Sequence, residues 1–574
     1  MCGIAGSYGP ADIRRMTATL THRGPDDEGF YSSGPVQFGA RRLSIIDLTT
    51  GHQPLATADG SHWITYNGEL FNYLEVRADL ECLGFQFKTT SDTEVVVTAY
   101  KAWGKQCLDR FIGMFAFAIW DGREIFIARD RLGEKPLYYW SQGGRFLFAS
   151  EIKALLVEVT PESALDESFP VLEAVLEPDT LFRGIRALEP GCHLVFNGST
   201  VKVERYWSIP EGPIDTRSAS DLTEELLWLL KDSVRLRLRS DVPVGLFLSG
   251  GLDSSLLAGL ARPQKTFTCH LPYGPAYDEL SYARTMADSI SCEMHTATVG
   301  PEDFRRDFPK VIWHLEQPIA TTSSIAEFAL ARLARQHVKV AIGGQGADEA
   351  FGGYVRYALL AEEERIGASP LFKEYHPLAR LLWGPQVFGP QADRYFRLIQ
   401  RGVGSTAPLE EARRIFDRKG SLVDRMGAVD FKMTFPSLIT MNDRAAAAFG
   451  VENRTPLLDH RLIEFAFRLP PELKLHGGQT KILLRRASRG IVPDAIIDRP
   501  DKKGLGVPVG RWLQNELKDW ATDLSESLAR RGVTLAASED RGEFDRTLFT
   551  KVSLELWFRT FIDNRGVGPI SGNS

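Results

Sequence analysis

One glycine-rich stretch, SGGLDSS at residues 249–255, constrains the fold of this chain more than any other feature. Apolar residues alternate from Val242 to Leu248 before it, which predicts a buried strand, and the residues after it predict a helix. A glycine-rich turn between a strand and a helix N-terminus suits phosphate, because backbone N–H groups and the helix dipole favour negative charge there. The alternative interpretation is an ordinary strand–turn–helix whose serines only cap the helix.

The side chains of this loop extend its expected chemistry. Gly250 and Gly251 allow close approach of a ligand to the backbone. Asp253 would repel a bare phosphate, so it implies Mg²⁺ between its carboxylate and the phosphate oxygens. The Gly-Lys-Ser/Thr ending of a Walker loop is absent. Hydroxyl donors are supplied by Ser249, Ser254 and Ser255.

Length, charge and cysteine usage exclude several classes of protein. A chain of 574 residues is long enough for at least two domains with their own cores. The net charge of −6 argues against nucleic acid as a routine partner. The longest apolar run, residues 111–120, is too short to span a bilayer, and the N-terminus lacks a secretory signal. Six scattered cysteines without a C-x-x-C pair indicate the reducing cytoplasm and no cysteine metal site.

The chain begins Met1-Cys2-Gly3, which places a nucleophile at position 2. Removal of Met1 would make Cys2 N-terminal, and its small side chain permits that removal. The α-amino group, with an ordinary pKa of about 7.7–8.0, could then serve as the base for the thiol. Nucleophile and base would lie in one residue.

Four further motifs give this cysteine a context: THRGPD at 21–26, RRLSIID at 41–47, YNGELFN at 66–72 and TSDTE at 90–94. Together with Cys2 they resemble the class II, N-terminal-nucleophile glutamine amidotransferases. The resemblance implies an α+β layered sandwich in the first half of the chain. Short apolar runs separated by turns between residues 113 and 149 agree with layered β structure.

The resemblance implies a role for each matched residue. Cys2 would attack the side-chain amide of glutamine. The Asn67 side chain and the Gly68 N–H would form the oxyanion hole, with about 3–4 kcal/mol per donor. Arg42 would bind the α-carboxylate of glutamine, and Asp92 with Glu69 its α-ammonium. A hairpin turn at Asn67-Gly68 is the structural alternative, and it is compatible with the oxyanion hole.

The second half alternates strands and helices. Residues 266–270 predict a further strand, and the resemblance of the SGGLDSS loop to the pyrophosphate loop of the ATP pyrophosphatases implies that this strand flanks the adenine of ATP, with Phe247 and Cys269 as candidate contacts. Residues 338–342 predict another strand, which runs into GGQGADEAFGG with Gly343 and Gly344. Two strands that end in glycine-rich loops indicate an α/β doubly wound parallel sheet with the ligand at the carboxyl ends. Asp348 is then a second Mg²⁺ ligand opposite Asp253, or else a solvated helix start.

The SGGLDSS loop resembles the pyrophosphate loop of the ATP pyrophosphatases. An N-terminal-cysteine glutaminase followed by this loop resembles the glutamine-dependent asparagine synthetase family over residues 2–565. The resemblance implies that ATP and Mg²⁺ activate a carboxylate as its acyl-adenylate. Ammonia from glutamine would cross a protected passage and displace AMP. Lys502 would stabilise the reacting acyl-phosphate, with Lys503 as the rival.

The same resemblance implies the domain organisation and the partners. A glutaminase domain is expected at 2–209, a linker at 210–220, an ATP-dependent synthetase domain at 221–565 and a frayed tail at 566–574. The partners would be glutamine, ATP and a carboxylate acceptor, with no nucleic acid and no membrane. A homodimer is left open.

Three neutral residues depart from the family pattern. Gln345, Gln317 and Thr321 stand where the family has acids. A glutamine can hydrogen-bond ammonia but cannot take its proton, so the alternative bases are Glu349 and the pyrophosphate itself. Whole-chain resemblance favours aspartate as the acceptor. The alternatives are another carboxylate, such as a cell-envelope or natural-product precursor, and a regulatory glutamine sensor that binds ATP without turnover.

Overall fold

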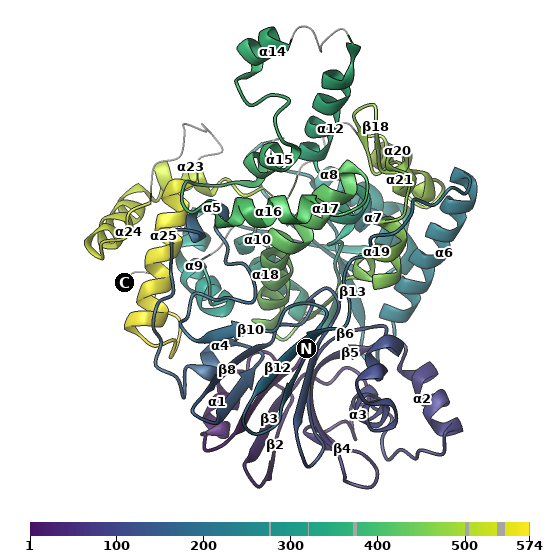
Figure 1. Ribbon diagram of the computed structural model, residues 1–574, viewed down its shortest axis with the longest axis vertical. Coiled ribbons are helices and arrows are strands. Elements are labelled where there is room, and N and C mark those ends of the chain that lie inside the picture. The colour runs from purple at the N-terminus through teal and green to yellow at the C-terminus, as the bar shows by residue number, and fades with distance from the viewer. Residues whose placement is uncertain are drawn as a thin grey trace.

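The computed structural model describes residues 1–274, 277–318, 321–370, 376–499, 504, 506–535 and 546–572. A β-rich N-terminal half lies at the bottom of Figure 1, and a larger, mostly helical C-terminal half lies above it. The two candidate lysines, Lys502 and Lys503, fall outside the described residues. No helix in the described part of the chain is long and apolar enough to cross a membrane.

The N-terminal half is built on two six-stranded antiparallel sheets. One has the order β10-β8-β9-β1-β3-β2, with the bounds β1 Gly3–Tyr8, β2 Asp27–Ser33, β3 Val36–Arg42, β8 Tyr138–Gln142, β9 Arg145–Ala149 and β10 Ile185–Ala187. The other has the order β12-β11-β7-β6-β5-β4, with the bounds β4 Leu55–Ala56, β5 Trp63–Leu70, β6 Gly113–Trp120, β7 Ile125–Arg129, β11 Cys192–Phe196 and β12 Val201–Arg205.

The two sheets face each other and carry helices outside. Phe38 and Phe148 of the first sheet share a buried cluster with Ile127 of the second. The opposite face of the second sheet packs on α2 (Tyr73–Cys82) and α3 (Asp92–Trp103). Strand β6 is therefore covered on both faces, which explains its unbroken apolar sequence GMFAFAIW. The layered sandwich expected from the sequence is confirmed.

The C-terminal half contains a five-stranded parallel sheet of order β15-β14-β13-β16-β17. Its bounds are β13 Val244–Phe247, β14 Lys265–His270, β15 Glu293–Thr298, β16 Val340–Ile342 and β17 Glu452–Arg454. The strand order reverses between β13 and β16. Loops on the two sides of such a reversal diverge and leave a crevice at the carboxyl ends of the strands, where ligands bind. The doubly wound parallel sheet is confirmed.

Helices flank this sheet on both faces. Helices α6 (Ala219–Arg237), α7 (Leu252–Ala261) and α8 (Leu280–Ser289) share a cluster with Leu246 and Ile342. Phe267 packs instead on α10 (Ser324–Arg335). Ser218 caps helix α6, because its side chain accepts a hydrogen bond from the Asp221 N–H at 3.2 Å.

The remaining elements lie around the sandwich and the sheet (Figure 1). Their bounds are α1 Ile13–Ala18, α4 Ile152–Leu155, α5 Phe169–Leu172, α9 Pro301–Leu315, α11 Ala347–Phe351, α12 Val355–Ala368, α14 His376–Trp383, α15 Gln391–Ile399, α16 Ala407–Phe416, α17 Leu422–Met433, α18 Phe435–Ala447, α19 His460–Ala466, α20 Pro471–Lys474, β18 Leu475–His476, β19 Gln479–Thr480, α21 Ile482–Ser488, α22 Asp494–Ile497, α23 Val509–Gln514, α24 Lys518–Arg530 and α25 Thr547–Trp557.

The C-terminal segment packs back onto the C-terminal half. Gly566 accepts a hydrogen bond from the Trp313 indole N–H at 2.9 Å. A Cβ at Gly572 would lie 2.5 Å from the backbone oxygen of Arg305. The expectation of a frayed tail is wrong for these residues, because they have tertiary contacts.

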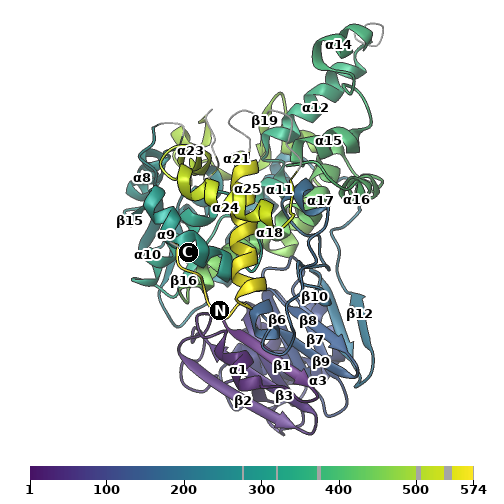
Figure 2. The same cartoon turned by 90° about the vertical axis from the view of Figure 1, so that its left-hand side faces the viewer.

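The two halves meet along the edge strand β17, and Figure 2 places the N-terminus at this boundary. Met1 and Ile45 share a buried cluster with Val340 and Val451. Buried ion pairs cross the same boundary. They join Arg23 to Asp443, Lys135 to Asp443, Arg444 to Glu151 and Lys153 to Glu316. These buried ion pairs fix the position of the two halves relative to each other, because separating a pair would leave each charge buried without its partner.

Candidate active sites

Cys2 lies immediately before β1 and is 7% exposed. Its backbone N–H donates to Asn67 Oδ1 at 3.0 Å, and its carbonyl accepts from Arg23 Nε at 3.0 Å. Burial raises the pKa of the Cys2 thiol, although the N-terminal ammonium and Arg42 act in the opposite direction. The backbone of the candidate nucleophile is thus fixed from two sides.

Asn67 and Gly68 lie inside β5, opposite Ala116 and Phe115 of β6, so the hairpin-turn interpretation is wrong. A Cβ at Gly68 would lie 2.2 Å from the Met114 carbonyl oxygen, which explains the glycine. Asn67 Nδ2 is buried and has no hydrogen-bond partner within the described residues. An unpaired buried donor beside a nucleophile can stabilise an oxyanion.

The residues expected to bind the charged ends of glutamine surround the same site. Arg42 Nη2 donates to the backbone carbonyls of Ile46 and Asp47 at 2.9 and 2.5 Å. On the other side, burial raises the pKa of Asp92 to about 6, with a further contribution from Glu452. Burial and the same glutamate also raise the pKa of Glu69. Buried carboxyl groups this close together favour a cation.

In the structure two cations lie here: Arg454, which is 3.5 Å from Glu69 Oε1 and 2.7 Å from Glu452 Oε1, and the N-terminal ammonium of Met1, which is 3.0 Å from Glu452 Oε2. Met1 is 1% exposed. While Met1 is present, the nitrogen of Cys2 is an amide that donates to Asn67 and cannot act as a base. The presence of Met1 therefore blocks the chemistry expected of Cys2, and its removal stays a prediction.

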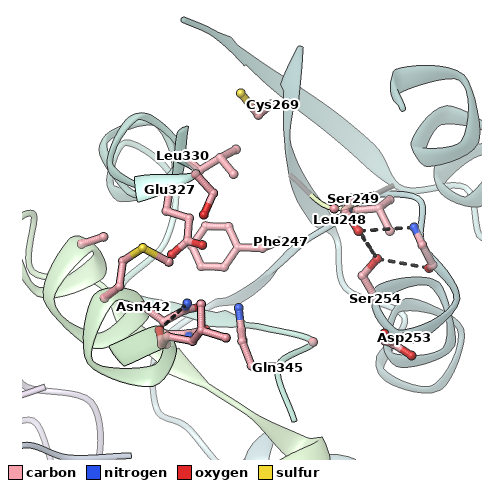
Figure 3. Close-up of a pocket in the computed structure, with 18 of the residues that line it drawn as sticks. Phe247, Leu248, Ser249, Asp253, Ser254, Cys269, Glu327, Leu330, Gln345 and Asn442 are labelled. Atoms are coloured by element: carbon pink, nitrogen blue, oxygen red, sulfur yellow. Dashed lines mark hydrogen bonds between the residues drawn. The ribbon is translucent and has the colours of Figure 1, made fainter. Parts of the chain in front are cut away.

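The SGGLDSS loop connects β13 to α7, as its sequence predicts. Gly250 has φ of 78°, and a Cβ there would lie 2.5 Å from the Ala283 nitrogen. Ser254 Oγ lies 3.3 Å from the Ser249 N–H and 3.0 Å from its hydroxyl (Figure 3). Gly251 is the N-cap of α7 and has no side chain to occupy the first N–H groups. These groups are available to an anion.

The two candidate metal carboxylates converge on one lysine. Lys481 Nζ lies 2.6 Å from Asp253 Oδ2 and 2.7 Å from Asp348 Oδ1, and its side chain is 2% exposed. Asp348 is therefore held by an ion pair and is more than a solvated helix start. The sequence analysis missed Lys481, whose only local signal is its place directly before α21. Within the described ranges, no group of three or more His, Cys, Asp or Glu side chains could hold a metal alone.

A cavity of about 360 Å³ lies at the carboxyl ends of β13, β14 and β16 (Figure 3). Ser255, Gly250 and Gly343 lie beside it, outside its lining. Two residues that sequence reasoning missed, Glu327 and Asn442, also line it. The predicted residues that line it are Phe247, Ser249, Gly251, Asp253, Ser254, Cys269, Gly344, Gln345, Asp348 and Glu349.

Two buried carboxyl groups in this cavity titrate near neutral pH. Burial and the charge of Asp348 raise the pKa of Glu349 to about 7, against a hydrogen bond from the Tyr354 hydroxyl to Oε1 at 2.6 Å. Burial raises the pKa of Glu327 to about 8, against a hydrogen bond with Ser323. Both groups therefore hold a proton more readily than an exposed glutamate, so Glu327 can donate a hydrogen bond and Glu349 can exchange a proton. In the sequence, Glu327 is marked only as a single acidic residue in a mostly apolar helix.

Gln345 lies deep in the same cavity beside Asn453. The amide oxygens of Gln345 and Asn453 are both buried without a hydrogen-bond partner in the described part of the chain. A Cβ at Gly343 would lie 2.3 Å from the first oxygen and 2.6 Å from the second. Two unpaired acceptors suit an amine that donates hydrogen bonds. Gln317 and Thr321, the other neutral positions, line separate cavities.

The chain matches the family models of the glutamine amidotransferase domain over residues 1–207 and of asparagine synthase over residues 225–556. A putative glutamine-hydrolysing asparagine synthetase of Mycobacterium bovis is 34% identical, over 100% of this chain and 99% of the relative. Glutamine-hydrolysing asparagine synthetase 1 of Bacillus subtilis is 31% identical, over 98% of both chains. Amidase chry2 of Gibberella zeae is 30% identical, over 85% of this chain and 84% of the relative.

Fold, sites and similarities together define a glutamine-dependent carbon–nitrogen ligase that amidates a carboxylate. The chain belongs to the asparagine synthase family, whose members use ATP.

Proposed function

We propose that this protein hydrolyses glutamine, activates a carboxylate with ATP as an acyl-adenylate, and transfers the ammonia to that carboxylate. The observation that supports it best is the position of β17 between the two sites. Glu452 lies against the Met1 ammonium beside Cys2, and Asn453 lines the ATP cavity. Successive side chains of a strand point to opposite faces, so one short strand borders both sites.

The glutaminase reaction follows from the arrangement around Cys2. After removal of Met1, the α-amine takes the proton of the thiol, and the thiolate attacks the side-chain carbonyl of glutamine. The Asn67 amide and the Gly68 N–H stabilise the oxyanion. Ammonia leaves, a thioester forms on Cys2, and water then releases glutamate. Arg42 binds the α-carboxylate of glutamine. Asp92 and Glu69 bind the α-ammonium of the same substrate.

ATP binds in the cavity with its adenine beside Phe247 and Cys269, and the leaving pyrophosphate on the SGGLDSS loop. Asp253 and Asp348 fit Mg²⁺, because they already share one cation and Asp253 Oδ1 is buried without a partner in the described residues. Mg²⁺ would neutralise charge on the leaving pyrophosphate. Lys481 then donates to phosphate oxygens, and Lys502 stabilises the reacting acyl-phosphate.

Ammonia crosses from Cys2 to the acyl-adenylate along β17, shielded from water by the interface between the two halves. In bulk water it would be protonated and would lose its nucleophilicity. The amide oxygens of Gln345 and Asn453 orient it by accepting its hydrogen bonds. Glu349, with a pKa of about 7, accepts the proton that Gln345 cannot.

Two acceptors have support. The similarity to relatives named asparagine synthetase favours aspartate, which would make asparagine. The neutral Gln345 and the presence of a relative named amidase favour a different carboxylate.

The functional units are the expected ranges 2–209 and 221–565. All six cysteines are free thiols in the structure, which suits work in the reducing cytoplasm.

The test is the stoichiometry of ATP cleavage. The protein is incubated with glutamine, ATP, Mg²⁺ and aspartate or another carboxylate, and the nucleotides are separated by chromatography. AMP and pyrophosphate in equal amounts support the proposal. ADP and phosphate would contradict it.

A further inference from the structure

A second cavity of about 390 Å³ adjoins the ATP cavity. Ser323, Tyr354, Leu438 and Gly504 line both. Cavities of about 300–1,000 Å³ hold drug-sized ligands. ATP would occupy the first cavity, so the second cavity remains for the acceptor. Its volume is far larger than aspartate needs.

The described lining of the second cavity carries cations and hydroxyls and no carboxylate. Its cations are Arg356, Arg401 and Arg546. Arg356 pairs with Asp430 at 2.6 Å, and Arg546 lies 4.0 Å from Glu173. Both acids lie outside the described lining, to which the chain contributes three guanidinium groups. Arginine forks match carboxylate and phosphate oxygens.

Arg356 is held rigidly beside the reacting centre. Its Nε donates to the Tyr395 hydroxyl at 3.0 Å, Nη2 donates to Asp430, and the guanidinium stacks 3.6 Å above the Tyr354 ring. Nη1 has no hydrogen-bond partner among the described residues. The hydroxyl of the same tyrosine donates to Glu349 in the first cavity. One aromatic ring therefore separates the fixed arginine from the candidate base.

We propose that the acceptor is larger than aspartate and carries a second anionic group, a carboxylate or a phosphate, which binds in this cavity while its reacting carboxyl lies beside Gln345. The inference rests on the proposed amidation and names the class of its acceptor. Arg356, Arg401 and Arg546 bind the anionic group. Thr321 and Ser323, whose hydroxyls lie 3.1 Å apart, offer hydrogen bonds along the connecting wall.

The experiment compares three acceptors: aspartate, the dipeptide aspartyl-glutamate and its neutral-tailed match aspartyl-glutamine. AMP release is measured with glutamine, ATP and Mg²⁺, and mass spectrometry identifies the amide. The variants are Arg401→Gln, Arg546→Gln and their double. Arg356 is left intact, because its loss would strand the buried Asp430. The control is Arg414→Gln, on α16, whose side chain is 75% exposed and lies outside both cavities.

A charge-assisted hydrogen bond contributes enough for a preference of about 10- to 100-fold. We expect kcat/KM for aspartyl-glutamate to exceed that for aspartyl-glutamine and for aspartate by that factor. The double variant should lower the preference by slowing aspartyl-glutamate alone, because only Arg356 remains to bind the anionic group, and the control should keep it.

Two results would contradict the inference, and they are distinguishable. Equal use of the two dipeptides, or best use of aspartate with no effect of the arginine variants, overturns the acceptor class and leaves the amidation intact. Glutamine hydrolysis without AMP release from any acceptor overturns the proposed function itself, and the acceptor class with it.

Discussion

The two candidate sites differ in which of their polar groups the chain itself contacts. Around Cys2, the backbone of the nucleophile, Arg42 and the Met1 ammonium all have short contacts within the protein, while Asn67 Nδ2 and Glu69 Oε2 are buried without a partner among the described residues. Around the SGGLDSS loop, carboxyl and amide oxygens are left unpaired beside an open cavity. The comparison teaches that the first site is organised for one small substrate, while the second must accept several partners in sequence.

The largest effect is expected from Cys2→Ala, which should remove glutamine use and leave synthesis from ammonium salts. Only the first half supplies the nucleophile, and the synthetase cavity contains no residue before Phe247. Glutamate release and AMP release are measured in parallel. Cys107→Ala, which removes another buried thiol, is the matched control. Glutaminase activity at near the original rate in Cys2→Ala would break the separation of the two sites.

Lys481→Met should lower AMP formation by about 10²–10³-fold, the loss typical when one donor to a developing charge is removed. Glutamine hydrolysis should continue, because Lys481 lies only in the second site. Lys474→Met offers a comparison, since that lysine is also buried and paired with an aspartate but lies outside the cavity. Equal losses in both variants would indicate a role in folding alone.

Asn453→Leu tests the passage along β17. Leucine has nearly the shape of asparagine but cannot accept a hydrogen bond, so ammonia should lose an acceptor inside the protein. We expect glutamine hydrolysis to persist, while the amide formed per glutamate released falls about tenfold. Asn442→Leu, at another amide in the same cavity, is the control. An unchanged ratio in Asn453→Leu would show that transfer does not depend on β17.

The smallest effect concerns pH. A base with a pKa of about 7 must be ionised to accept a proton, so the amide formed per glutamate should fall as the pH drops below 7. Between pH 7 and pH 6 the loss should be about fivefold. Glu349→Gln should be slow throughout and should flatten the profile, whereas Glu327→Gln should retain it. A wild-type profile that is flat between pH 6 and 8 would contradict the role of Glu349.

Strand patterns and glycine-rich loops made the second sheet predictable, because parallel strands bring their carboxyl ends together and so place Asp253 near Asp348. Lys481 could not be found in this way, since it lies 228 positions from its partner Asp253 and contacts it only through the tertiary fold. The alternative of a hairpin turn at Asn67-Gly68 is wrong, because a sequence that favours a turn can also lie in a strand. There the close approach of Met114 requires the glycine.

The internal transfer of ammonia is the central claim, and isotope competition tests it most directly. The protein is given glutamine labelled with ¹⁵N in its amide, ATP, Mg²⁺ and the acceptor that releases AMP, in an excess of unlabelled ammonium chloride. Mass spectrometry reads the isotope in the amide product. Transfer along β17 predicts a product that is mostly ¹⁵N-labelled. A product labelled only in proportion to the free ammonium pool would contradict the account.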